Sequence, residues 1–242
     1  MQDWYREQRA PDDLRDQLAC TWQASVGGPP HTLVPDGCLD LLWIEGGALR
    51  LCGPETSAWT FSLPPDTSAV GIRFHPGVAP SVLGLDASEL LNTRIDIEDF
   101  WGDRAARHLR DRLEAAHDDV ARVDVLADLA RERLVDEPPV DEVARAVVEE
   151  LAEQRTPVRE LAGVVGLSER QLHRRCTAAF GYGPSVLARI LRLQRFLALA
   201  RQTTAGGLAE LAAIAGYADQ PHLTREVRAI ADTTPAALRD AA

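Results

Sequence analysis

The chain has 242 residues, with no lysine and only four cysteines. Every positively charged side chain is therefore an arginine. Cys20, Cys38, Cys52 and Cys176 are widely spaced and form no Cys-x-x-Cys pair, which disfavours a disulfide framework and a structural zinc site. No apolar run approaches the roughly 20 residues of a membrane-spanning helix. Residues 1–20 are charged, so we expect no secretory signal, no membrane partner and a cytoplasmic location.

Motifs of common catalytic sites are also missing. The sequence has no nucleophile elbow, no phosphate-binding loop and no paired-carboxylate motif. We therefore predict that the protein is not an enzyme and holds no cofactor. The hydrophobic content of 45% is that of a globular protein, and the length is sufficient for two domains.

The net charge of −11 is unevenly distributed along the chain. Residues 1–154 carry 14 arginines against 30 acidic residues, a net charge of −16, whereas residues 155–242 carry 12 arginines against 7, a net charge of +5. A basic half attached to an acidic half is a compositional sign of nucleic-acid binding.

The N-terminal part has the pattern of short strands separated by turn residues. Leu39–Ile44 and Ala48–Leu51 flank Glu45-Gly46-Gly47 and predict a hairpin, and Ser68–Phe74 predicts another strand. Helical periodicity begins after Pro76 and includes 103–116 and 120–134. The predicted fold class is α+β: a small antiparallel sheet or partial barrel with trailing helices, then an all-α domain.

A domain boundary is predicted at the proline pair of Asp136-Glu137-Pro138-Pro139, because neither proline suits a helix interior. It divides the chain into residues 1–137 and 138–242. In the second domain the pattern predicts helices over 141–152, 158–165, 168–180, 185–200, 208–215 and 220–230.

The second domain contains the same pattern twice, about fifty residues apart. The first copy consists of Leu161-Ala162, Gly166, Leu172, Arg174 and Pro184, and the second of Leu211-Ala212, Gly216, Leu223, Arg225 and Pro235. Small alanines allow two helices to approach, and the glycines suit a left-handed residue at a helix end. Ser168 and Asp219 are suitable N-caps for the helices that follow. The pattern predicts two helix-turn-helix motifs, at about 158–180 and 208–230.

The stretch Leu208–Arg225 (LAELAAIAGYADQPHLTR) resembles the signature of the AraC/XylS family of bacterial transcription regulators, and Val158–Pro184 resembles that family's upstream helix-turn-helix. The resemblance covers about residues 141–240. It implies a sequence-specific regulator whose two recognition helices contact adjacent major-groove segments of double-stranded DNA, about 34 Å apart. The helix over 185–200 would hold that spacing.

The resemblance also assigns the residues that would contact DNA. In the first motif these are Arg170, His173 and Arg174; in the second they are Gln220, His222, Thr224 and Arg225. Cys176 and Val227 stand where the family usually has an aromatic residue, and Asp232 where it usually has glycine.

The N-terminal domain is expected to modulate DNA binding. His31–Trp43 and Gly71–Pro76 resemble an uncharacterised domain found fused to such DNA-binding domains, which implies no known ligand. Trp43, Arg73 and His75 are the candidate residues for a small-molecule effector site, since Trp and Arg are common in pockets. The alternative is that the tryptophans fill a core and Arg73 pairs with a carboxylate such as Asp40.

Three further alternatives stay open at the level of sequence. A metal or redox sensor, or an enzyme, could be built from His31, Cys38, Asp40, Cys52 and His75, although their spacing matches no known metal motif. The helices over 103–134 could pair in a homodimer or pack within their own domain. RNA polymerase would be a partner if the protein activates transcription.

Overall fold

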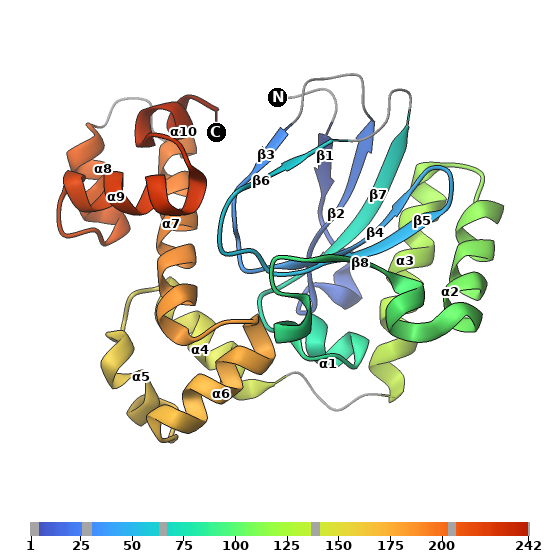
Figure 1. Cartoon of the computed structure of the whole chain (residues 1–242), viewed down its shortest axis with the longest axis horizontal. Coiled ribbons are helices and arrows are strands. Elements are labelled where there is room, and N and C mark those ends of the chain that lie inside the picture. The colour runs from blue at the N-terminus through green and yellow to red at the C-terminus, as the bar shows by residue number, and fades with distance from the viewer. Residues whose placement is uncertain (1–4, 26–30, 63–66, 137–140, 203–206, 242) are drawn as a thin grey trace.

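The computed structural model describes residues 5–25, 31–62, 67–136, 141–202 and 207–241. A sheet-based N-terminal region is followed by a helical C-terminal region, as the predicted α+β class requires (Figure 1). The domain boundary predicted at residue 137 lies outside the described residues. No helix within these ranges is long and apolar enough to cross a membrane.

Six strands form one antiparallel sheet in the order β1-β2-β7-β4-β5-β8. They are β1 (Tyr5–Gln8), β2 (Leu18–Ser25), β4 (Leu39–Ile44), β5 (Ala48–Cys52), β7 (Ser68–Phe74) and β8 (Arg94–Asp96). A separate ribbon pairs β3 (His31–Leu33) with β6 (Trp59–Phe61). The predicted hairpin is confirmed as β4 and β5, and the predicted strand at 68–74 is β7.

The two faces of the sheet have different neighbours. Along β4, Leu39, Leu41 and Trp43 point into a core that they share with helices α2 (Ile97–Ala115) and α3 (Asp119–Asp136). Because side chains alternate along a strand, Asp40 and Leu42 lie on the opposite face. That second face is turned toward the β3–β6 ribbon and the C-terminal helices (Figure 1).

The apolar stripe of α3 is used inside the domain. Val123, Ala127 and Ala130 are buried in the same core as the sheet residues. The short elements η1 (Asp12–Leu14), α1 (Ala79–Leu83) and η2 (Ala87–Leu90) also contribute to this core between the sheet and helices α2 and α3. Most of the stripe therefore packs within its own domain, whereas Val120 at its start is exposed.

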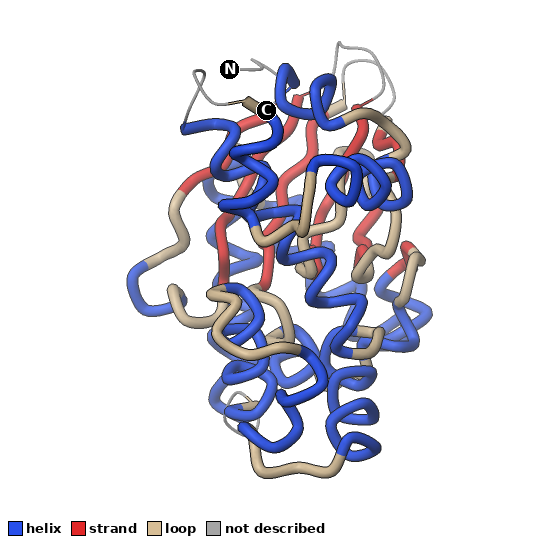
Figure 2. Tube along the Cα trace, turned by 90° about the vertical axis from the view of Figure 1, so that its left-hand side faces the viewer, coloured by secondary structure: helices blue, strands red, loops and turns tan. Residues whose placement is uncertain are grey.

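The C-terminal region is entirely helical over its described residues. Its helices are α4 (Glu142–Ala152), α5 (Val158–Val164), α6 (Glu169–Phe180), α7 (Pro184–Gln202), α8 (Leu208–Ala215), α9 (Gln220–Ala231) and α10 (Pro235–Ala241). Helices α4 to α9 agree with the predicted ranges to within two residues at each end, whereas α10 was not predicted. In Figure 2 the upper helices of this region lie in front of the strands, and the lower helices lie below them.

The turns of both predicted motifs form as their residue types require. Gly166 and Gly216 have φ of +69° and +89°, the left-handed region that glycine adopts most easily. Ser168 caps α6 in a capping box with Gln171, and Asp219 caps α9 through the His222 amide. Both pairs, α5–α6 and α8–α9, are therefore helix-turn-helix units.

Helix α7 joins the two units. Its first half contributes Leu187 and Ile190 to the core of the first unit, and its second half contributes Leu193 and Phe196 to the core of the second. The 19-residue helix therefore belongs to both units.

Asp232 ends α9 with φ +47° and ψ +33°, a left-handed conformation that is unfavourable for any residue with a Cβ. Its carboxylate also lies at the negative end of the helix dipole. We expect Asp232→Gly to raise the free energy of unfolding by about 1 kcal/mol, measured by urea denaturation. Asp232→Asn removes only the charge and should recover less than the glycine variant. A destabilised glycine variant would contradict this account.

Candidate nucleic-acid interface and interdomain cavity

The outer face of α6 presents the residues predicted to contact DNA. Arg170, His173 and Arg174 are exposed, and within the described chain the two guanidinium groups form no ion pair. Arg175, the next residue, instead pairs with Asp141 at 2.8 Å. Arg170 and Arg174 are one helical turn apart and so share a face, where both charges are available to phosphates or bases.

Asp141 fixes the position of α6 relative to α4. Its carboxylate caps α4 by accepting from the Val143 and Ala144 amides and also accepts from Arg175 Nε. Partial burial acts to raise the pKa of Asp141, but Arg175 and the two amides outweigh it and lower the pKa. The ionised carboxylate is thus the form that the fold stabilises.

The predicted residues of α9 divide into two groups. Gln220 and Arg225 are exposed, and Arg225 has no ion pair among the described residues. His222 and Thr224 are engaged within the motif: His222 Nδ1 accepts from the Ala218 amide at 3.3 Å, and Thr224 Oγ1 donates to the Gln220 carbonyl at 2.9 Å. Gln220 and Arg225 are therefore the better placed candidates for base contact.

Arg228 is a candidate that the sequence interpretation missed. It is exposed on α9 and follows Arg225 by three residues, which places both on one face. The helical spacing of the two arginines was the available signal, but the resemblance drew attention only to the start of the helix.

Glu226 attaches α9 to the connecting helix. Its carboxylate is 3.0 Å from Arg189 Nε and 3.6 Å from Arg192 Nε, both on α7, and 3.7 Å from His222 Nε2. The Glu226 side chain is only 12% exposed, so these contacts are shielded from salt more than surface pairs are. The second recognition helix is thereby held on α7.

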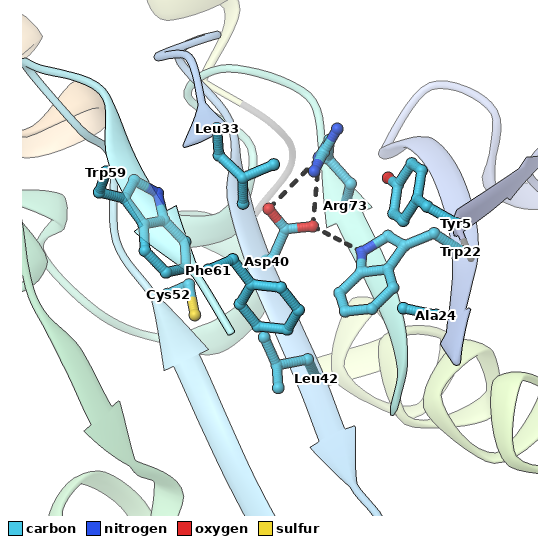
Figure 3. A pocket seen from close by; sticks show the side chains of 10 residues that line it. All are labelled: Tyr5, Trp22, Ala24, Leu33, Asp40, Leu42, Cys52, Trp59, Phe61 and Arg73. Atoms are coloured by element: carbon cyan, nitrogen blue, oxygen red, sulfur yellow. Dashed lines mark hydrogen bonds and ion pairs between the residues drawn. The ribbon is translucent and has the colours of Figure 1, made fainter. Parts of the chain in front are cut away.

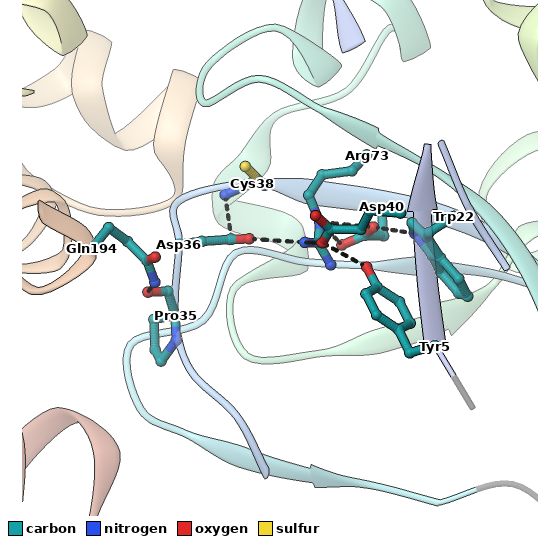
Figure 4. A network of polar contacts seen from close by, with 9 residues as sticks. Tyr5, Trp22, Pro35, Asp36, Cys38, Asp40, Arg73 and Gln194 are labelled. Carbon is teal, nitrogen blue, oxygen red and sulfur yellow. Dashed lines mark hydrogen bonds and ion pairs between the residues drawn. The ribbon is translucent and has the colours of Figure 1, made fainter. Parts of the chain in front are cut away.

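Both helix-turn-helix units contact the N-terminal region. The Ala58 amide donates to the Ile230 carbonyl at 2.6 Å, and Gln194 Nε2 of α7 donates to the Pro35 carbonyl at 2.7 Å (Figure 4). In the first unit, α6 packs against η2, and Arg174 shares a surface depression with Asp86.

A cavity of about 490 Å³ lies between the second face of the sheet and the C-terminal helices. We call it the interdomain cavity. It is lined by Tyr5, Glu7, Ala19, Cys20, Thr32, Leu33, Val34, Pro35, Asp36, Cys38, Asp40, Cys52, Gly53, Glu55, Trp59, Arg73, Gln194, Leu197, Arg201 and Leu238. An aromatic recess adjoins it, where Trp22 and Phe61 join Tyr5 and Trp59 (Figure 3). The volume of the interdomain cavity is within the range of small-molecule sites.

Arg73 is the centre of a polar network in this cavity. Its Nε donates to Asp40 Oδ1 at 3.2 Å, and its Nη1 lies 3.3 Å from Glu7 and 3.5 Å from Asp36 (Figures 3 and 4). Trp22 Nε1 also donates to Asp40 at 2.8 Å. Burial raises the pKa of Asp40 even though Arg73 acts in the opposite direction. For Arg73, burial acts to lower the pKa, but Asp40 and Asp36 raise it well above its ordinary value.

Of the three residues predicted for an effector site, only Arg73 lines the cavity. Trp43 is 2% exposed in the core on the opposite face of the sheet, because it is an odd number of residues away from Asp40 on β4. His75 follows β7, and its Nε2 lies 3.1 Å from the Arg15 carbonyl, away from the lining. Trp43 and His75 therefore lie outside the lining of the interdomain cavity. The suggested pairing of Arg73 with Asp40 is confirmed.

Three cysteines face the cavity as thiols. Burial raises the pKa of Cys20 and of Cys52 to about 12, and that of Cys38 well above its ordinary value. These thiols are therefore protonated at neutral pH, and thiolates are the reactive form. In the part of the chain that is described, no group of three or more His, Cys, Asp or Glu side chains could hold a metal ion; the His31 side chain lies outside that part.

Two family models match different parts of the chain. A family model for a helix-turn-helix domain matches residues 161–241, and one for a domain of unknown function (DUF6597) matches residues 6–96. No curated protein matches the chain. The structure is similar to that of ToxT from Vibrio cholerae O395, with 9% sequence identity and a TM-score of 0.48 over 99% of this chain and 98% of that chain. It is also similar to wild-type ToxT from Vibrio cholerae strain SCE256 with a bound unsaturated fatty acid, with 9% identity and a TM-score of 0.44 over 87% of this chain and 93% of that chain.

The matched helix-turn-helix model and the two units observed in the structure define the chain as a DNA-binding regulator of transcription. Its C-terminal region is an AraC-type helix-turn-helix domain, and its N-terminal region is a DUF6597 domain. The resemblance inferred from the repeated pattern is thus confirmed.

Proposed function

We propose that α6 and α9 contact adjacent major-groove segments of one operator, and that an effector in the interdomain cavity changes the affinity for it. The observation that carries this proposal is the shared lining of the cavity. Strands of the N-terminal region form one wall, and Gln194, Leu197 and Arg201 of α7 with Leu238 of α10 form another. A molecule bound there touches the helix that joins both DNA-binding units.

The contacts of the first unit support the same coupling. Because α6 packs against η2 and because Arg174 and Asp86 line the same surface depression, the N-terminal region lies near a residue proposed to contact DNA. A negative carboxylate near that surface disfavours the approach of phosphates. An effector that binds one relative arrangement of the two regions more tightly than another would shift DNA affinity by the difference between the two binding free energies.

Selection of bound sequences from random duplex DNA, with and without cell metabolites, tests the proposal. We expect the selected duplexes to share one asymmetric site of two segments. The amount of this duplex that is recovered should change when cell metabolites are added. Affinity for the selected DNA should fall about 100-fold or more between 50 and 200 mM salt, since phosphate contacts release counterions. A flat salt response, or recovery of no consensus, would contradict DNA recognition.

The remaining partners are also proposals. A double-stranded DNA target supports a cytoplasmic location. Light scattering at micromolar concentration would detect a homodimer, although α3 offers it little apolar surface. In vitro transcription with RNA polymerase would separate activation from repression.

A further inference from the structure

The interdomain cavity combines aromatic walls with an excess of acidic groups. The rings of Tyr5, Trp22, Trp59 and Phe61 come from three different strands and face one recess (Figure 3). Rings of this kind bind apolar groups and also attract cations to their faces. The protein itself uses one of them in this way, since Arg94 lies 3.6 Å from the centre of the Trp59 ring.

The charges that line the cavity do not balance. Four carboxylates (Glu7, Asp36, Asp40 and Glu55) face two guanidinium groups (Arg73 and Arg201). Arg94 neutralises Glu55 through a direct ion pair. Three carboxylates then remain for Arg73 and the exposed Arg201, so the cavity keeps a surplus negative charge.

Arg73 is already paired with acidic neighbours. Its Nε and Nη1 contact three carboxylates within 3.5 Å. An anionic ligand that approached this guanidinium would meet those carboxylates and would have to displace them. The raised pKa of Asp40 also shows that one arginine does not fully offset the burial of these acids. A positive charge added here would offset the energetic cost of burying the carboxylates, whereas a negative charge would add to that cost.

We propose that the interdomain cavity binds a small organic cation, with its positive head beside Asp36 and Asp40 and its apolar body among the four rings. The proposal rests on the proposed function, in which this cavity is the effector site. A metal ion is the wrong cation, because the described residues present no cluster of metal ligands. A volume of about 490 Å³ suits a molecule rather than an ion.

Isothermal titration calorimetry with three probes of one body tests the charge preference. The full chain is titrated with phenylbutyl-trimethylammonium, phenylbutyrate and phenylbutanol. We expect the ammonium to bind at least about tenfold more tightly than the other two. Equal affinities, tighter binding of phenylbutyrate, or no binding of any probe would overturn the proposal.

The carboxylates are tested by Asp36→Asn, which retains the oxygen that accepts from the Cys38 amide. Affinity for the ammonium should fall about fivefold or more, whereas that for phenylbutanol should not change. Asp99→Asn, an exposed position on α2, is the matched control and should leave both affinities unaltered. Glu7→Gln on the edge strand β1 is the second variant if Asp36→Asn does not fold. Unchanged ammonium affinity in the carboxylate variants would refute a cation site.

Adding selected operator DNA separates this proposal from the regulatory one. If the ammonium binds but leaves DNA affinity unchanged, the cation site stands and effector control through it fails. If phenylbutyrate binds more tightly and shifts DNA affinity, effector control stands and the cation proposal fails.

Discussion

Arg174→Ala and Arg225→Ala are each expected to weaken binding to the selected operator by about 5- to 150-fold, equivalent to about 1–3 kcal/mol. Both side chains are exposed on the outer face of a recognition helix, and no ion pair holds either one among the described residues. An arginine that donates two hydrogen bonds to guanine contributes discrimination of this size. Fluorescence anisotropy with labelled duplex measures the loss.

Two comparisons decide what the arginines do. Arg145→Ala, an exposed arginine on α4 paired with Glu142, should leave operator affinity almost unchanged. Losses that are equal on operator and random duplex would identify Arg174 and Arg225 as phosphate contacts. An Arg174→Ala protein that binds its operator normally would remove α6 from the interface.

Phe180→Ala is expected to lower the free energy of unfolding by about 3–5 kcal/mol. Phe180 ends α6, is 1% exposed, and packs against Gly77 so closely that a Cβ there would lie 2.6 Å from the ring. Its removal leaves a cavity between α4, α6 and the loop that contains Gly77. Urea unfolding measures the effect by both tryptophan fluorescence and far-ultraviolet circular dichroism.

The position of the tryptophans makes the two signals informative. All five precede residue 102, so fluorescence reports on the N-terminal region, whereas circular dichroism reports on both regions. If Phe180 joins the regions, both transitions move to lower urea. Phe180→Leu should lose less stability, because it keeps most of the apolar volume. A change below about 1 kcal/mol for Phe180→Ala would mean that this contact adds little.

The local structure of the C-terminal region follows from residue types that act within a few positions. Ser168, Gly166 and Gly216 fix helix ends through capping and backbone conformation, and these preferences are visible in any sequence window. The positions of the buried leucines follow from helical periodicity in the same way. The exposure of Arg174 follows from the same periodicity, whereas the bond of His222 to the Ala218 amide depends on the geometry of the turn.

The interdomain cavity depends instead on contacts between distant segments. Pro35 and Gln194 touch across 159 residues, and no local pattern links them. Trp43 was assigned to the pocket by its residue type, although strand alternation from Asp40 already placed the two on opposite faces. The suggested Arg73–Asp40 pair was correct because those residues are directly opposite each other on β7 and β4.

The continuity of α7 sets a limit on the operator itself. Since Pro184–Gln202 is one uninterrupted helix with a recognition unit packed on each half, neither unit can slide along the duplex independently. One additional base pair between the two segments moves the second by about 3.4 Å along the axis and about 35° around it. Under the proposed contact of α6 and α9 with two adjacent segments, a site with a longer or shorter spacer would be out of phase with the protein, even when both half-sequences are intact.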